Sequence, residues 1–72
     1  MDQLLALRYF CKVAETASFT AAATAFSVPP SSISRRISDL ETNLGTHLLT
    51  RSTRAVKLTE IGTAYYEQVK EI

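Results

Sequence analysis

The stretch PPSSISRRISDLETNLG, residues 29–45, decides how this chain folds. On a helical wheel, four of its apolar side chains fall within about 60° of one another: Ile33, Ile37, Leu40 and Leu44. Short hydroxyl side chains and an arginine gather on the opposite side, with Ser34 on the flank: Ser31, Arg35, Ser38 and Thr42. Such a face suits phosphate oxygens and base edges in a DNA groove, whereas an enzyme site usually needs carboxylates, imidazoles or thiolates that converge on a pocket. The pattern therefore predicts a helix that contacts nucleic acid with its outer face.

The residues that flank this helix predict a helix-turn-helix. Val28 and Pro29 are expected to be extended, because a proline disfavours the helical conformation in the residue before it. Pro30 suits the first turn of a new helix, and Gly45 suits its left-handed C-cap. A short preceding helix with Ser18 as its N-cap therefore ends within about four residues of the start of the new one. Its small residues are expected to allow close approach to a neighbouring helix: Ala21, Ala22 and Ala25.

Other local signals predict the remaining elements. A first helix over about residues 2–16 presents an apolar stripe: Leu4, Leu7, Phe10, Val13, Ala14 and Ala17. Residues 48–58 change to a strand-like pattern, with apolar arms on both sides of a polar tip at residues 52–54. Thr59 is the expected N-cap of a last helix, in which Gly62 predicts a close backbone approach. The apolar stripe of that helix runs to the final residue, so the chain is expected to be cut inside a helix: Ile61, Tyr65, Val69 and Ile72.

Size and composition narrow the class of protein. A chain of 72 residues with 46% hydrophobic residues can form one domain, whose core must come from helix packing, with dimerisation as a further aid. Its single cysteine, Cys11, excludes an internal disulfide and is expected to be a buried small hydrophobe rather than a redox sensor. No second His or Cys lies near His47, which argues against a metal site. The chain has no apolar run of membrane-spanning length and no signal-peptide pattern, so a cytoplasmic location is expected.

Positive charge is concentrated in the middle of the chain, although the formal net charge is only +1. Residues 26–58 hold five basic side chains against two acidic ones, which leaves +3. Residues 59–72 hold one basic side chain against three acidic ones, which leaves −2. Because a local basic patch attracts phosphate even on a nearly neutral protein, the middle segment is the expected site of contact with a polyanion.

Three ordered motifs span most of the chain: SFTxAA at residues 18–23, ISRxIxxLExxLG at 33–45 and LLxRxxRxVxLTxxG at 48–62. With these motifs, about residues 4–65 resemble the N-terminal domain of LysR-type transcriptional regulators. The resemblance implies a mainly α-helical, winged helix-turn-helix fold, with a three-helix core and a short two-stranded wing over residues 1–58. Residues 59–72 would then be the N-terminal part of a linker helix that pairs two subunits.

The resemblance also implies site residues and partners. Residues 30–43 correspond to the recognition helix in the major groove, and the wing near Arg54 would reach phosphate or the minor groove. The candidate DNA-binding residues are Ser18, Thr20, Pro30, Ser31, Ser32, Ser34, Arg35, Arg36, Arg51 and Arg54. The candidate dimerisation residues are Ile61, Tyr65, Val69 and Ile72. The expected partners are a partly palindromic double-stranded DNA operator and a second copy of the chain, with a higher oligomer in the full-length protein.

No catalytic residue, metal or cofactor is expected in this fragment, and a small-molecule co-inducer would bind a C-terminal domain beyond residue 72. Two positions depart from the family pattern. Pro29-Pro30-Ser31 stand where members usually have Ser-Gln-Pro, so the glutamine that commonly reads a base is missing and base specificity cannot be transferred. Leu49 stands where phenylalanine is usual, which is expected to alter the packing under the wing.

Several assignments have a structural alternative. Arg35 either reaches the groove or pairs with Asp39, four residues further on. Arg36 either contacts phosphate or bonds back to the protein, and Arg51 either reaches phosphate or braces the hairpin. Arg54 is either a DNA contact or an idle surface side chain, and the serines at the start of the recognition helix can cap it as well as contact DNA.

Two other classes of function compete with DNA binding. A winged helix can also serve as a protein-interaction module, but the outer face of residues 30–43 has no aromatic or aliphatic anchor of the kind that dominates binding energy. An enzyme is nearly excluded, because the sequence shows no catalytic triad pattern, metal cluster or Gly-rich phosphate loop. Salt dependence separates the first two classes, since binding to phosphate weakens steeply as salt is added.

Overall fold

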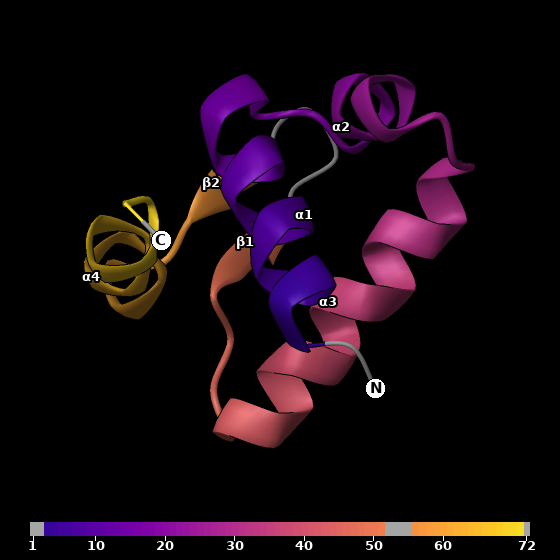
Figure 1. Cartoon of the computed structure of the whole chain (residues 1–72). Coiled ribbons are helices and arrows are strands. Elements are labelled where there is room, and N and C mark those ends of the chain that lie inside the picture. Colours follow the sequence, from indigo (N-terminus) through magenta and orange to yellow (C-terminus); the bar gives the residue numbers. More distant parts are fainter. Residues whose placement is uncertain (1–2, 52–55, 72) are drawn as a thin grey trace.

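The computed structural model describes residues 3–51 and 56–71 of the chain. In that part the chain forms four helices and two strands: α1 (Gln3–Thr16), α2 (Phe19–Phe26), α3 (Pro30–Leu44), β1 (Leu49–Arg51), β2 (Val56–Leu58) and α4 (Glu60–Val69). α1 crosses the centre of the molecule, with α3 on one side and α4 on the other (Figure 1). The strands pair antiparallel, with Leu49 opposite Leu58. The predicted class is confirmed: a mainly helical core of three helices with a two-stranded wing and a further helix.

Four of the predicted helix boundaries carry the expected residues. The Ser18 side chain accepts a hydrogen bond from the backbone N–H of Ala21 at 3.1 Å, which caps α2. Pro29 is extended (φ −66°, ψ 148°) and Pro30 opens α3. Gly45 closes α3 in the left-handed conformation at φ 73°, and the Thr59 side chain caps α4.

The core lies where α1 packs against the other helices and the base of the wing. Its buried apolar residues are Ala6, Tyr9, Phe10, Val13, Ala22, Ala23, Ile33, Ile37, Leu40, Leu48 and Leu49. The predicted inner face of α3 is confirmed for its first three residues, but Leu44 is 39% exposed. Leu44 is the last residue of α3, and this C-terminal end of α3 extends beyond the N-terminal end of α1 (Figure 1). Leu49, the first residue of β1, is buried in the core at the base of the wing.

The predicted contact faces of the first two helices are only partly correct. On α2, Ala22 is buried as expected, but Ala21 and Ala25 are exposed and Ala23 is buried in their place. Residues 22 and 23 lie on the same face as the half-buried ends of the helix at 19 and 26, which is the spacing of one helical stripe. On α1, Leu4 is 51% exposed, whereas residues 6 and 9 are buried; residue 17 is exposed and follows the end of the helix.

The last helix is shorter than the sequence predicts. It ends at Val69, and residues 70 and 71 form an exposed turn, whereas the apolar stripe suggested a helix to the final residue. Side chains that are exposed gain little from burial to offset the entropy of ordering another turn. Ile72 lies outside the described residues. In the described residues, no helix has both the length and the hydropathy that a membrane span requires.

Candidate nucleic-acid interface

The outer face of α3 presents hydroxyl groups and arginines to solvent. Ser31, Arg35 and Thr42 are exposed, and the flanking side chains are half-buried: Ser32, Ser34, Arg36 and Ser38. The ion pairs between described residues join Lys12 to Glu15, Glu41 to His47 and Glu67 to Lys70. The alternative pairing of Arg35 with Asp39 is therefore not formed in the described structure. Within the described part of the chain, the Arg35 guanidinium has no ion-pair partner and can bind an external anion.

The N-terminus of α3 has no side-chain cap. Pro29 occupies the N-cap position without a side-chain hydrogen bond, so Ser31 and Ser32 do not serve as caps there. Pro30 carries no backbone N–H, and the Ser32 N–H donates to the Pro29 carbonyl at 3.0 Å. At the start of α2, by contrast, Ser18 is half-buried and engaged as a cap, while Thr20 is exposed. Both helices thus begin with polar side chains. Ser18 is used to cap α2, whereas Ser31 and Ser32 are not used to cap α3.

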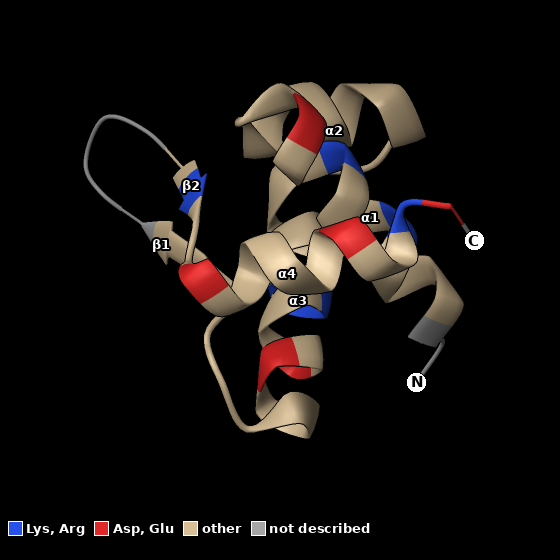
Figure 2. Cartoon of the chain, turned by 90° about the vertical axis from the view of Figure 1, so that its left-hand side faces the viewer, with Lys and Arg blue, Asp and Glu red and all other residues tan. Residues whose placement is uncertain are grey.

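The wing supplies a second basic element. Figure 2 shows basic positions on α3 and β2, and acidic positions on α3 and α4. Lys57 is exposed on β2, and its carbonyl accepts a 3.2 Å hydrogen bond from the Thr50 hydroxyl. Arg51 pairs with Val56 at the end of the strands. Arg54, with the rest of residues 52–55, lies outside the described residues, so its predicted contact with DNA stays a prediction.

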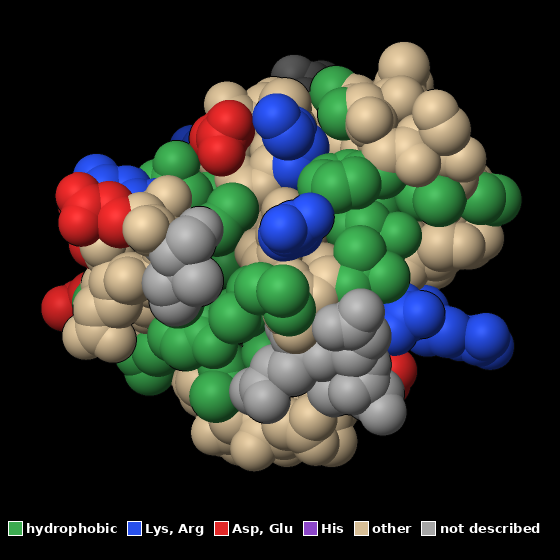
Figure 3. Space-filling view, in the orientation of Figure 1, with side chains coloured by type: hydrophobic (Ala, Val, Ile, Leu, Met, Phe, Trp, Pro, Cys, Tyr) green, Lys and Arg blue, Asp and Glu red, His purple; other side chains and the backbone are tan. Residues whose placement is uncertain are grey.

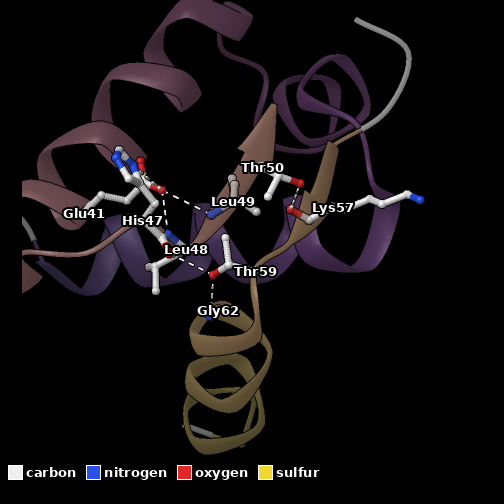
Figure 4. A network of polar contacts seen from close by, with 8 residues as sticks. All are labelled: Glu41, His47, Leu48, Leu49, Thr50, Lys57, Thr59 and Gly62. Carbon is white, nitrogen blue, oxygen red and sulfur yellow. Dashed lines mark hydrogen bonds and ion pairs between the residues drawn. The ribbon is translucent and has the colours of Figure 1, made fainter. Parts of the chain in front are cut away.

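Glu41 is a residue whose role sequence reasoning missed. Its side chain is almost completely buried, and Oε2 accepts hydrogen bonds from the backbone N–H groups of Leu48 at 2.7 Å and Leu49 at 3.1 Å (Figure 4). The exposed His47 ring lies 3.9 Å from the same oxygen. One signal was present in the sequence: a carboxylate beside the apolar residue Leu40 must find partners if it is buried.

Thr59 and Gly62 join the start of α4 to the same loop. The Thr59 hydroxyl donates to the His47 carbonyl at 2.8 Å and accepts from the Gly62 N–H at 2.9 Å (Figure 4). The Thr59 N–H donates to the Leu48 carbonyl at 2.9 Å. A Cβ on Gly62 would overlap the carbonyl carbon and oxygen of Leu48. The close approach that the sequence predicts at Gly62 is therefore confirmed.

The four candidate dimerisation residues differ in their surroundings. Ile61 is 55% exposed, whereas Tyr65 and Val69 are half-buried against the core of their own chain. The Tyr65 ring lies 5.7 Å from the ring of Phe10 between centroids, and burial raises the pKa of its hydroxyl, with Cys11 as a smaller cause. Ile72 lies outside the described residues. Contact with the chain's own core is thus one function of this stripe, and dimer contact stays a prediction.

Cys11 lines a groove between α1 and the end of α4. The groove measures about 400 Å³, and Leu7, Phe26 and Val69 form part of its wall. In Figure 3, hydrophobic side chains gather across the face on which α1 lies, with Lys and Arg side chains among them. Cys11 is half-buried, not fully buried as predicted. Burial, and to a smaller extent the charge of Glu15, raises the pKa of its thiol above the ordinary value of 9.0.

The thiol is expected to react slowly with alkylating agents at neutral pH, because the thiolate is the reactive form. The rate of alkylation by iodoacetamide, measured against pH, should have a higher midpoint in the folded chain than an ordinary cysteine thiol has. Glu15→Gln should lower the midpoint, since it removes a negative charge that disfavours the thiolate. Chain unfolded in urea is the control and should show a lower midpoint than the folded chain. A midpoint at or below that of the unfolded chain would contradict the structure.

In the described residues, no group of three or more His, Cys, Asp or Glu side chains is placed to hold a metal ion. The groups that the site does present are hydrogen-bond donors and cations. Hydroxyl and guanidinium groups on α3, with the exposed Lys57 on the wing, can bind phosphate oxygens and base edges.

Comparison with known proteins agrees with this geometry. The family model of bacterial regulatory helix-turn-helix proteins, lysR family, matches residues 4–63. The transcriptional regulator YhjC of Escherichia coli (strain K12) is 50% identical over 72 residues, which are 100% of this chain and 24% of that protein. An HTH-type transcriptional repressor of Pseudomonas aeruginosa (strain UCBPP-PA14) is 48% identical over 68 residues, 94% of this chain and 22% of that protein. The chain thus spans about a quarter of the length of these relatives.

The protein chain of a solved protein–DNA complex has the same fold as this chain. The BenM DBD bound to catB site 1 DNA superposes with a TM-score of 0.91 at 39% identity, and the match covers 99% of this chain and 78% of that one. At this level of similarity, the order and packing of the helices and the wing are shared along almost the whole chain.

Proposed function

Since the chain belongs to the LysR family of bacterial regulatory helix-turn-helix proteins, we propose that it binds specific sites on double-stranded DNA as part of a transcriptional regulator. α3 enters the major groove, and its N-terminal half contacts bases and phosphates. The wing near Arg54 contacts phosphate or the minor groove beside it. The related proteins are transcriptional regulators rather than enzymes, which agrees with this assignment.

The observation that carries the proposal is the exposed outer face of α3. Arg35 is exposed and free of an ion pair with its neighbour Asp39, and Ser31 is exposed at a helix start that has no side-chain cap. A guanidinium that is not paired within its own chain can donate two parallel hydrogen bonds to a base edge or a phosphate. The similarity to a domain solved on DNA supports the same orientation.

Two segments of the chain have different roles in the proposed function. We assign residues 1–58 to DNA binding and residues 59–72, which include α4, to the pairing of two subunits. Ile61 is available for the second assignment, because it is 55% exposed on α4 and burial of its side chain against a second chain would be favourable. Two paired chains would bring one α3 to each half of a partly palindromic operator. The remaining three quarters of the relatives' length leaves room for a domain that binds a co-inducer.

The experiment that tests the proposal is selection from a pool of random duplex DNA at two salt concentrations, with sequencing of the retained molecules. We expect a two-fold-related motif, and affinity that falls as salt rises, because Arg and Lys displace counterions from phosphate. Retention without a motif would reduce the function to non-specific phosphate binding. No retention at either salt would favour the protein-interaction module instead.

Arg35→Ala is expected to weaken binding to the selected site by about 2 kcal/mol, or roughly 30-fold, if Arg35 contacts a base. Fluorescence anisotropy with a labelled duplex measures the dissociation constant at fixed salt. Arg8→Ala removes the same side chain from an exposed position on α1 and is the matched control, with less than about threefold loss expected from charge alone. Equal losses for the two variants would show that Arg35 contributes only general positive charge.

A further inference from the structure

A polar junction joins three elements that the proposed function uses separately. It consists of Glu41 on α3, the loop of residues 45–49 that leads into the wing, and Thr59 with Gly62 at the start of α4 (Figure 4). The loop lies between α3 and α4 and is hydrogen-bonded to both. Any change in this loop would therefore alter how α4 is placed relative to α3.

Glu41 holds the loop from the side of α3. Its backbone carbonyl accepts from the N–H groups of Gly45 at 2.8 Å and Thr46 at 3.2 Å. Its carboxylate accepts from the N–H groups of Leu48 and Leu49. Glu41 thus accepts from four of the five backbone N–H groups of the loop, and the residue is only 8% exposed. Hydrogen bonds to a buried carboxylate are strong and directional, so the loop is held in one position on α3.

Thr59 holds the same loop from the side of α4. Its hydroxyl bridges the His47 carbonyl and the Gly62 N–H, and its backbone N–H donates to the Leu48 carbonyl. The absence of a side chain at Gly62 lets the first turn of α4 rest directly on the Leu48 backbone. α4 is therefore seated on the loop by two hydrogen bonds and by backbone contact.

We infer that this junction sets the direction of α4 relative to α3, and thereby the spacing between half-sites that a dimer recognises. The inference rests on the proposed function, in which α4 pairs two chains and α3 reads each half-site. In such a dimer, the separation and rotation of the two α3 helices depend on the angle at which α4 leaves each domain. One added base pair moves the half-sites apart by about 3.4 Å and rotates them by about 34°, so a rigid junction discriminates between spacings. Glu41 and Thr59 act here as positioning residues.

The test is the binding of wild-type and variant chains to duplexes in which the spacing between two selected half-sites is changed by one or two base pairs. Thr59→Val removes the hydroxyl and keeps the branched shape, whereas Thr59→Ser keeps the hydroxyl. Wild type and Thr59→Ser should lose about tenfold in affinity for one added base pair, and Thr59→Val only about threefold. Thr63→Val is the matched control, because the Thr63 hydroxyl bonds only within α4, to the Thr59 carbonyl at 3.0 Å.

The outcomes separate this inference from the proposed function. If the wild-type chain binds two half-sites without a preferred spacing, the dimeric arrangement of the proposed function fails and this inference fails with it. If wild type has a sharp optimum and folded Thr59→Val keeps the same optimum and width, only the inference is overturned. A general loss of stability would lower affinity at every spacing alike and would leave the optimum in place.

A distance measurement within one chain tests the same inference without DNA. Spin labels are attached at Asn43→Cys on α3 and Gln68→Cys on α4, both exposed positions, in a Cys11→Ala background diluted with unlabelled chain. Double electron–electron resonance should show one narrow distance distribution for the parent and Thr59→Ser, and a broad one for Thr59→Val and Glu41→Ala. Circular dichroism shows whether each variant is folded, and one folded variant, Thr59→Val or Glu41→Ala, is sufficient to test the inference. A narrow, unchanged distribution in a folded variant overturns the inference.

Discussion

Phe10→Ala is expected to lower the free energy of unfolding by about 4 kcal/mol, the largest single loss among the changes considered. Phe10 is completely buried on α1, and its ring centroid lies 5.7 Å from that of Tyr65 and 6.4 Å from that of Tyr66. Removal of the ring leaves a cavity at the centre of the core and deletes two aromatic contacts that seat α4 on α1. A domain of this length has about 4–11 kcal/mol of stability in total.

Urea unfolding followed by circular dichroism measures this change. Leu4→Ala on the same helix is the control: Leu4 is 51% exposed, so its loss should cost less than about 1 kcal/mol. Phe10→Ala should also increase the solvent accessibility of the Tyr65 and Tyr66 side chains, because both rings lose their contact with the Phe10 ring. Similar costs for Phe10→Ala and Leu4→Ala would show that α4 is not seated through Phe10.

Gly62→Ala is expected to destabilise the fold by about 3 kcal/mol, although the same change inside a helix normally stabilises by about 1 kcal/mol. The reason for the reversed sign is steric. The new Cβ would overlap the carbonyl group of Leu48, a backbone group that cannot rotate away. Leu48 is itself fixed, since its N–H is bonded to Glu41 and its side chain is fully buried. The first turn of α4 would therefore have to move off the loop.

The other glycine provides the control for this prediction. Gly45 adopts φ 73° with open space around its missing side chain, so Gly45→Ala meets conformational strain without a clash. That strain should cost about 1 kcal/mol. The urea concentration at the midpoint of unfolding should be highest for wild type, lower for Gly45→Ala and lowest for Gly62→Ala. The reverse order would mean that α4 is not in contact with the Leu48 backbone.

Local signals in the sequence were sufficient for most of the helix boundaries. Ser18, Pro30, Gly45 and Thr59 act at the ends of helices through their own side chains or their own backbone preferences, so their effect does not depend on distant residues. The apolar spacing of α3 likewise predicts its buried face correctly as far as Leu40. The same spacing makes Leu44 part of that face, but the structure exposes Leu44 because α3 extends past the helix that covers it.

Contacts between one element and another could not be predicted in this way. Backbone N–H groups of the loop that follows α3 donate to the carboxylate of Glu41. Every residue except proline has such a donor, so the sequence does not show which of them a buried carboxylate will use. Tyr65 shares a stripe with Ile61, which suggested a common dimer face. The structure divides them, since Tyr65 packs on Phe10 whereas Ile61 remains exposed.

The sequence by itself determined the type and order of the elements, most of the ends of the helices and the polar outer face of α3. These features follow from capping, glycine and proline geometry, and helical period, all of which act over a few neighbouring residues. Only the tertiary structure decided which edge residues are buried, how Glu41 and Thr59 tie the loop to α3 and α4, and where α4 rests. These depend on the relative placement of helices, and a pattern within one helix contains no information about where its neighbour ends.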